Sequence, residues 1–433
     1  MTDPTPRRGV LMVAFHFPPQ KGSSGLQRTL RFVQYLRDYH FAPQVLTARA
    51  AAYGATSTDQ LADIPADVPV VRACALDASR HLAVRGKYLG FTAVPDRWAT
   101  WIPAAVLAGW RAVRRTRPVV LFSTYPIASA HAVGALLQRL TGLPWVADIR
   151  DPMTGPGSPA TGLRHYAHRA IERAVARRAS QVVFATAEAR AEFLQTFPTL
   201  APERLHVVEN GFDEQDFAAA EQFNAAPLVV DATKPLVHNA VPPLVLLHSG
   251  LLSPDTRSPV PFFQALAAVL QDGCFAGRPL RVVFRASSSE AVHRPLAQQF
   301  GLGEVVQWLP GLPYREALAE MLRADALLIF QGVQHNPQIP AKIFEYCRAG
   351  RPVFGLVGLA GKTARFMREE GLPSLAPLED ALAIEPALRR FLGQLLAGTV
   401  VGMPRERSAR FSRAARTAEL AAILETALLE RRA

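Results

Sequence analysis

A lysine and a glutamate three residues apart, Lys342 and Glu345, lie near the start of a helix predicted for 341–348. Pro340 suits the first turn of a helix, and a glycine and a proline end the helical pattern before the apolar run 353–357. The free N–H groups of a helix start attract phosphate, a lysine adds positive charge, and a carboxylate can accept hydrogen bonds from a ribose diol. This spacing predicts a site for a nucleoside diphosphate. A glutamate that only caps or pairs along an amphipathic helix is the alternative.

Other groups in the second half of the chain could complete this site. Gly250 follows an apolar run, where it would let a ligand approach the backbone, and Arg257 precedes the next predicted helix. A guanidinium can bind two phosphate oxygens at once. We therefore expect Arg257 to bind the diphosphate, together with Lys342 or Arg285.

A loop rich in glycine and serine opens a helix near the N-terminus. It follows the first apolar run and contains Lys21, Gly22 and Gly25. The pattern is not G-x-G-x-x-G, so it does not indicate dinucleotide binding, but its glycines permit close approach of a ligand to a positive helix start. An ordinary turn between a strand and a helix is the alternative.

Polar side chains also stand at the ends of two later apolar runs. Thr124 and Tyr125 follow one run, and Asp148, Arg150 and Asp151 close the next. Ligands of open α/β sheets bind at the carboxyl ends of strands, so both groups are candidates. Two acids around one arginine form either a satisfied ion-pair cluster or a set that binds an acceptor or orients a sugar, and both readings stay open.

The alternation of apolar runs and helical patterns predicts a parallel α/β fold. Strands are predicted at 10–15, 44–47, 119–122, 145–149, 182–185, 205–208, 244–248, 280–285, 305–308, 326–330 and 353–356. Helices are predicted at 25–37, 104–115, 128–141, 164–178, 188–196, 259–270, 291–300, 315–323, 341–348 and 363–370. We expect an N-terminal domain at 1–220, a linker at 221–243, a second domain at 244–404 and final helices at 405–433. Two Rossmann-like domains with a cleft between them follow from this pattern.

The segment 339–353 resembles the donor-site motif of GT-B glycosyltransferases, especially family 4, also called glycosyl transferases group 1. The family's helix reads as a proline, a basic or small residue, an apolar pair, a glutamate and a small-Gly-x-Pro-Val turn. The loop 15–28 and the Asn-Gly-Phe-Asp turn at 210–213 resemble the family as well. The resemblance implies two Rossmann-like domains whose parallel sheets face a central cleft, with C-terminal helices that cross back onto the N-terminal domain.

The resemblance also implies roles for individual residues. Arg257 and Lys342 would stabilise the departing diphosphate. The donor would be bound by Gly250, Arg257, Leu312, Ile339, Pro340, Ala341, Lys342 and Glu345. The sugar and acceptor side would be formed by Lys21, Gly22, Gly25, Thr124, Tyr125, Asp148, Arg150, Asp151 and His335.

Three positions depart from the family pattern. Pro337 stands where many members have a second glutamate that contacts the donor sugar, so Gln334, His335 or Asn336 would have to replace it. Some members place a histidine near 124–126, where this chain has Thr-Tyr-Pro, and no lysine follows the arginine at 257.

Composition is typical of a folded protein with more than one core. The chain has 433 residues, of which 49% are hydrophobic and 19% charged, and no apolar run approaches the roughly 18 residues of a membrane span. Its three cysteines, Cys74, Cys274 and Cys347, are too widely spaced for a disulfide framework or a zinc cluster. Nothing resembling a signal-peptide cleavage site follows the first apolar run, so we expect a cytoplasmic protein.

The formal net charge is +12. Arginine is dense at 111–117 and 164–178, which could face the anionic inner surface of the cell membrane; solvated helix faces are the alternative. Neither stretch alternates with aromatic residues as a groove for single-stranded nucleic acid would, so we expect no nucleic-acid partner.

Together these features predict a glycosyltransferase that moves a sugar from a nucleoside-diphosphate sugar to an acceptor hydroxyl in polysaccharide or glycolipid assembly. No D-x-D triplet occurs, so we expect no metal and no other cofactor. The resemblance implies retention of the anomeric configuration and a saccharide or lipid-linked acceptor. A GT-B-fold sugar-nucleotide epimerase or hydrolase, and an inactive donor-binding scaffold, are the alternatives.

Overall fold

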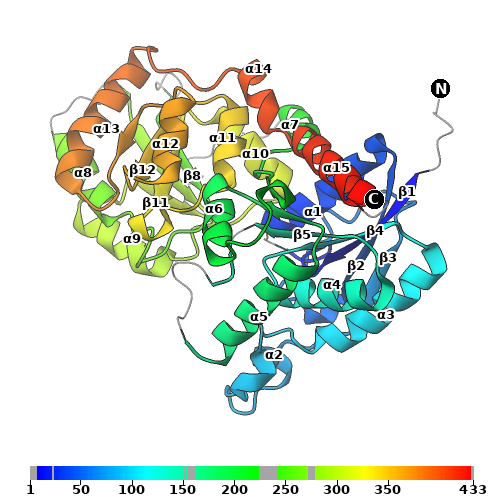
Figure 1. Ribbon diagram of the computed structural model, residues 1–433. Helices are drawn as coiled ribbons and strands as arrows, with labels where there is room; N and C mark the ends of the chain where they lie inside the picture. Colours follow the sequence, from blue (N-terminus) through cyan, green and yellow to red (C-terminus); the bar gives the residue numbers. More distant parts are fainter. Residues whose placement is uncertain are drawn as a thin grey trace. The chain divides into compact units, whose positions relative to one another are not determined.

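The computed structural model describes residues 7–21, 24–150, 152–154, 161–223, 242–271 and 278–430 (Figure 1). The chain divides into two compact units, one formed by Met1–Gly211 with Arg413–Ala433 and the other by Phe212–Ser412. The second unit thus extends beyond the expected range of 244–404 at both ends. Most of the expected linker lies outside the described residues.

The first unit is built on a seven-stranded parallel sheet with the order β3-β2-β1-β4-β5-β6-β7. Most of its strands are almost continuously apolar because helices cover both faces of the sheet. The strands are β1 Arg8–Ala14, β2 Phe41–Ala48, β3 Val70–Ala73, β4 Val120–Thr124, β5 Trp145–Arg150, β6 Gln181–Phe184 and β7 Leu205–Val207.

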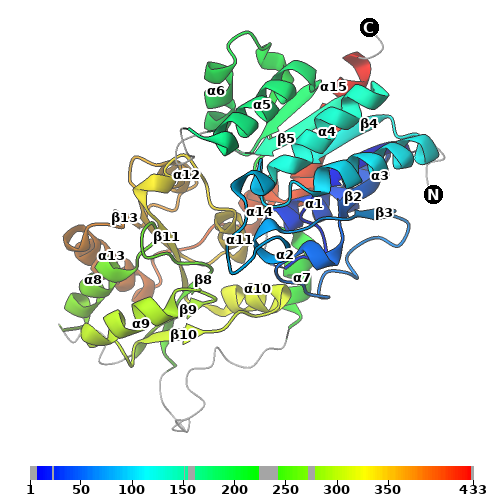
Figure 2. The ribbon, with the colours of Figure 1, turned by 90° about the horizontal axis from the view of Figure 1, so that it is seen from below.

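Two sets of helices sandwich this sheet. On one face, α1 and the C-terminal α15 pack side by side and bury residues such as Leu30 and Leu424. The other face is covered by α3 to α6, and Figure 2 shows α3 and α4 running next to each other. The helices are α1 Ser24–Tyr35, α2 Ala78–His81, α3 Trp101–Thr116, α4 Ala128–Thr141, α5 Leu163–Arg178, α6 Ala187–Thr196 and α15 Arg413–Glu430, with 3-10 turns η1 Leu36–Tyr39, η2 Ala50–Ala52, η3 Gly90–Ala93 and η4 Pro202–Arg204.

The second unit repeats the architecture with a six-stranded parallel sheet of order β10-β9-β8-β11-β12-β13. Helices α8, α9 and α13 contribute to the core on one face, and α7, α10, α11 and α12 to the core on the other. The strands are β8 Leu244–Ser249, β9 Leu280–Arg285, β10 Val306–Leu309, β11 Ala326–Gln331, β12 Val353–Val357 and β13 Leu375–Ala376. The helices are α7 Glu214–Glu221, α8 Val260–Gln271, α9 Glu290–Gln299, α10 Tyr314–Arg323, α11 Lys342–Ala349, α12 Lys362–Glu369, α13 Ala381–Leu396 and α14 Arg405–Ser408, with 3-10 turns η5 Val333–His335 and η6 Ala409–Phe411.

The predicted parallel α/β class, with two Rossmann-like units, is confirmed. The sequence analysis missed β3 and β13, which are short edge strands, and the helices α2, α7 and α13. It also placed the start of α11 one residue early, because Ala341 is the residue that precedes the helix and Pro340 lies before that. Short edge strands have only one neighbour and bury few side chains, so their sequence pattern is weak.

Candidate active site

In the second unit the strand order reverses between β8 and β11. Gly250 follows β8, and the turn η5 follows β11 closely. Ligands of open α/β sheets bind outside the carboxyl ends of the strands at such a reversal. The fold therefore brings the loop containing Gly250, the turn containing His335 and the start of α11 to one place.

The amine of Lys342 lies directly against Gly250. A Cβ atom built on Gly250, whose φ is +141°, would stand 1.8 Å from Lys342 Nζ, so only glycine leaves room for this arrangement. Nζ is buried and has no hydrogen-bond partner among the described residues. Burial lowers the pKa of Lys342 to about 8, the charge of Glu345 opposes this shift and the charge of Arg257 adds to it. A buried amine without an acceptor is unfavourable, and a bound anion would supply the acceptor.

Arg257 is held beside the same place by its neighbours. The backbone N–H of Arg257 donates to the carbonyl of Ser253 over 3.1 Å. The backbone carbonyl of Thr256 accepts from the N–H of Gly332 over 2.9 Å. This contact joins the loop after β8 to the end of β11. Burial, followed by the charge of Arg257, lowers the pKa of His335, so the two side chains interact electrostatically. The lowered pKa keeps His335 neutral, so the positive charge at this place comes from Lys342 and Arg257, and these two cations favour an anion there.

Glu345 is oriented by a tyrosine that the sequence analysis did not single out. Tyr314 Oη donates a hydrogen bond to Glu345 Oε1 over 2.7 Å. Because Tyr314 begins α10, this bond draws the loop that carries Leu312 toward the glutamate. The sequence analysis did not single out Tyr346 either, although it lies one helical turn after Lys342. Its hydroxyl accepts a hydrogen bond from the N–H of Ser249 over 3.1 Å. This bond connects α11 to the end of β8.

The start of α11 offers fewer free N–H groups than the sequence indicates. The N–H of Ile343 donates to the carbonyl of Pro340 over 3.0 Å, and that of Phe344 to Ala341 over 3.3 Å. Within the described part of the chain, the amide N–H groups of Ala341 and Lys342 donate no hydrogen bond to a backbone carbonyl. These two amides and the lysine amine are the donors that a phosphate could use. Ile339, just before them, is half-buried against the core of the unit.

Two neighbours do not serve as phosphate ligands. Arg285 was a candidate for completing the clamp, and this expectation is wrong: its Nε donates to Glu320 Oε2 over 2.8 Å, and its Nη1 to the carbonyl of Pro310 over 2.8 Å. His248, at the end of β8, is buried. Burial and then the charge of Lys342 lower its pKa to about 3, so His248 is neutral and adds no positive charge.

In the first unit, the carboxylate of Asp148 is enclosed by hydrogen-bond donors. It is fully buried and accepts two hydrogen bonds of 2.9 Å from Arg28, which lies on α1 and also donates to backbone carbonyls of the 208–209 segment. Thr124 Oγ1 donates to Asp148 Oδ2 over 2.7 Å. Both carboxylate oxygens are occupied, so the ion-pair reading of this cluster is favoured, with Arg28 and not Arg150 as the partner. No local pattern in the sequence pointed to Arg28.

The remaining strand-end residues of this unit have different surroundings. Arg150 is buried with a left-handed backbone (φ +66°), and its Nη1 lies 3.4 Å from the carbonyl oxygen of Tyr125. Burial, then the charges of Arg150 and Arg97, lower the pKa of His16 to about 4, which places a cationic group near the end of β1. Tyr125 is half-buried, Lys21 is exposed and Gly25 is buried in the first turn of α1, while Gly22 and Asp151 lie outside the described residues.

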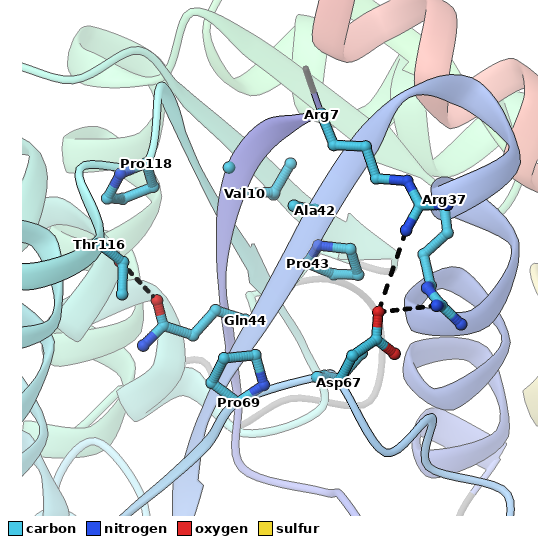
Figure 3. A pocket seen from close by; sticks show the side chains of 12 residues that line it. Arg7, Val10, Arg37, Ala42, Pro43, Gln44, Asp67, Pro69, Thr116 and Pro118 are labelled. Carbon is cyan, nitrogen blue, oxygen red and sulfur yellow. Dashed lines mark hydrogen bonds and ion pairs between the residues drawn. The ribbon is translucent and has the colours of Figure 1, made fainter. Parts of the chain in front are cut away.

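A cavity of about 260 Å³ lies elsewhere, at the amino ends of β1 and β2 (Figure 3). Asp67 pairs with Arg37 over 2.7 Å and with Arg7 over 3.9 Å at one side, and Thr116 donates to Gln44 at the other. Because it lies at the opposite end of the strands from the polar residues described above, we do not assign it to the same site.

No group of histidine, cysteine and acidic side chains among the described residues could hold a metal ion. Cys74 and Cys347 are free thiols, and Cys274 lies outside the described residues. None of the described helices is long and apolar enough to cross a membrane.

The sequence model of Glycosyltransferase Family 4 matches residues 58–216. A comparison with curated protein sequences gives no match. Many solved structures share the fold, among them the following three. HepE from Anabaena, in complex with UDP-glucose, has a TM-score of 0.62 and 17% identity over 97% of this chain and 100% of its own.

WaaG, a glycosyltransferase involved in lipopolysaccharide biosynthesis, has a TM-score of 0.58 and 14% identity over 96% of this chain and 99% of its own. UDP-GlcNAc 2-epimerase from Neisseria meningitidis, bound to UDP-GlcNAc, has a TM-score of 0.55 and 9% identity over 96% and 99%. The fold of this protein is therefore GT-B. The family match supports a glycosyltransferase, and the matched segment lies in the first unit except for its last five residues.

Proposed function

We propose that this glycosyltransferase transfers a sugar from a nucleoside-diphosphate sugar to the hydroxyl of a saccharide or lipid-linked acceptor at the inner face of the cell membrane. The observation that carries the proposal is the amine of Lys342, buried against Gly250 without a hydrogen-bond acceptor among the described residues. A diphosphate at this position would accept from Lys342 and Arg257, and Glu345 would accept from the ribose diol. HepE, which shares the fold, was solved with UDP-glucose.

The same groups account for the chemistry that the reaction requires. The bond between the anomeric carbon and the diphosphate breaks, and negative charge grows on the leaving oxygen. Lys342 and Arg257 would stabilise that charge, so we propose that no metal ion is needed. We further propose retention: the acceptor oxygen attacks from the face that the diphosphate leaves, and its proton passes to a phosphate oxygen. Nothing here requires a protein base.

Donor binding is tested by the melting temperature of the protein with a panel of nucleoside diphosphates and their sugars, in the presence of EDTA. At least one should raise the melting temperature, because a ligand that binds only the folded state stabilises it by mass action. A strict requirement for a divalent metal would contradict the metal-independent proposal.

Two variants test the assigned residues. Arg257→Ala and Glu345→Gln should each weaken donor binding by about 1.5–3 kcal/mol, the range of a hydrogen bond to a charged group. Arg257→Ala should also reduce turnover at saturating donor, since charge on the diphosphate grows in the transition state. Arg294→Ala is the matched control, because Arg294 is an exposed arginine of the same unit that pairs with Glu290 on its own helix. Unchanged affinity and turnover in both site variants would show that the site is misplaced.

An epimerase or hydrolase is the second candidate, because UDP-GlcNAc 2-epimerase shares the fold. Product analysis separates the possibilities. A transferase yields a glycoside when acceptor is present, an epimerase or hydrolase yields an altered or cleaved sugar nucleotide without acceptor, and an inactive scaffold yields neither.

A further inference from the structure

Two groups of opposite charge lie on one face of α11 without bonding to each other. Lys342 and Glu345 are three residues apart, a spacing at which side chains of a helix are neighbours and can form an ion pair. Here Lys342 Nζ lies against Gly250 and has no hydrogen-bond partner among the described residues. The carboxylate of Glu345 therefore does not bond to the amine, although the helix brings the two residues together.

A tyrosine from another helix holds this carboxylate. Tyr314 Oη donates to Glu345 Oε1 over 2.7 Å, from α10 to α11, and these two helices pack against each other. The tyrosine ring packs on the apolar core in which Phe344 of α11 is buried. Its backbone is fixed by the start of α10, where the N–H of Ala317 donates to the carbonyl of Pro313 over 3.0 Å. The hydroxyl of Tyr314 is thus a donor whose position is set by packing and by the helix start.

The separation of the two charges matters because they have different tasks in the proposed donor site. A diphosphate needs the ammonium group of Lys342, whereas a ribose diol needs the carboxylate of Glu345. If the carboxylate turned to the amine, the ion pair would occupy both groups, and a nucleotide would have to break it in order to bind. Side chains that must be reorganised on binding lower the affinity. A fixed donor that holds the carboxylate in advance removes this cost.

The other titratable neighbours of Lys342 do not replace this control. Burial, and then the charge of Lys342, lower the pKa of His248 on β8 to about 3, and burial raises the pKa of Tyr346, so both side chains are neutral. Burial lowers the pKa of Lys342 itself; of the nearby charges, that of Glu345 raises this pKa and that of Arg257, in the loop after β8, lowers it further. Of these four neighbours only Glu345 is negatively charged, so its distance from the amine controls how readily Lys342 is protonated.

We propose that Tyr314 is a positioning residue of the donor site, which holds the carboxylate of Glu345 away from the amine of Lys342 so that the cation meets the diphosphate and the anion meets the ribose. This role of Tyr314 rests on the proposed function and deepens it. Without the tyrosine hydroxyl, Glu345 turns toward Lys342 on the same helix face, and the site partly neutralises itself.

The test is calorimetry of inorganic pyrophosphate binding to the full-length protein, from about pH 7 to 10. In Tyr314→Phe the affinity at pH 7 should fall about threefold to tenfold, because the ion pair must be broken first. The pH above which affinity declines should rise by about one pH unit, since a closer carboxylate raises the pKa of the amine in the free protein. A tyrosine that only supported the fold would not move this pH profile.

A double variant shows whether Tyr314 acts through Glu345. With the carboxylate removed in Glu345→Gln, the further change Tyr314→Phe should alter pyrophosphate affinity by less than about twofold. Tyr39→Phe is the matched control, since Tyr39 is an exposed tyrosine of the other unit, and it should bind as the unaltered protein does. An equal loss with and without the carboxylate, or an unchanged pH profile in Tyr314→Phe, would overturn the proposal.

Failure of this role and failure of the donor site give different results. If the unaltered protein binds pyrophosphate, Arg257→Ala weakens that binding and Tyr314→Phe does not, the donor site stands and the role of Tyr314 is wrong. If the unaltered protein binds neither pyrophosphate nor any nucleoside diphosphate, the proposed function is wrong as well.

Discussion

At the residue scale, the buried amine of Lys342 is the group whose charge depends most on what is bound. In the ligand-free protein burial lowers its pKa to about 8, so part of the population is neutral near physiological pH. A diphosphate favours the ammonium form and raises the pKa in the complex. Binding and protonation are therefore linked.

This linkage predicts a pH-dependent donor affinity. As pH rises from about 7 to 9.5, the free protein loses the proton that the complex keeps, so affinity for a nucleoside diphosphate should fall above pH 8. Calorimetry across this range measures it. In Lys342→Gln, affinity should already be lower at pH 7 and should vary much less with pH. An equally steep profile in this variant would assign the titration to another group.

The lowered pKa of Lys342 also makes the stability of the ligand-free protein depend on pH, in the direction opposite to donor affinity. The pKa of Lys342 is lower in the folded state than its ordinary value of 10.5, so the unfolded chain binds more protons between about pH 8 and 10.5. The contribution of Lys342 to the free energy of unfolding therefore increases with pH over that window, while donor affinity decreases.

At the element scale, buried ion pairs fix how helices lie on the sheets. Arg28 joins α1 to β5 through Asp148, and Arg285 joins β9 to α10 through Glu320. Both pairs are largely removed from water, where the loss of one partner leaves an uncompensated charge.

We expect Asp148→Ala to destabilise the protein by about 3–5 kcal/mol, because Arg28 is left buried without its partner. Urea unfolding measures the change. The double variant Arg28→Met with Asp148→Leu should cost less than Asp148→Ala alone, since it removes both charges. If Asp148→Ala folds with full stability but loses acceptor turnover, the carboxylate belongs to the acceptor site after all.

At the scale of the whole molecule, the last helix completes the first unit although it follows the second in the sequence. Leu424 on α15 is fully buried in the core that also contains Leu30 of α1. The core of the first unit is therefore assembled from both ends of the chain.

This arrangement predicts unequal effects for two leucines of one helix. Leu424→Ala should lower the free energy of unfolding by about 2–5 kcal/mol through lost burial and a cavity. Leu429→Ala should change it by no more than about 0.5 kcal/mol, because Leu429 is 63% exposed. Thermal and urea unfolding of both variants check this. Similar losses in the two would mean that α15 does not pack as described.

The residues of the proposed donor site could be selected from the sequence because they are close together in the chain. Pro340, Lys342 and Glu345 lie on one turn of chain, and a proline, a cation and an acid at that spacing define the start of one helix. Their partners come from elsewhere in the unit: Tyr314 begins α10, and Gly250 lies in the loop after β8. Their contacts depend on strand order, which local sequence does not encode.

The sequence by itself determined most of the elements and the class of fold, because apolar periodicity records which residues are buried, and it placed cations and an acid near a helix start. Only the tertiary structure decided which charges remain available. It paired Arg285 with Glu320 and Asp148 with Arg28, and left the amine of Lys342 against Gly250 without an acceptor among the described residues. The reason is physical: the energy of a charge depends on its solvent exposure and on partners within a few ångströms, which are brought together from distant parts of the chain.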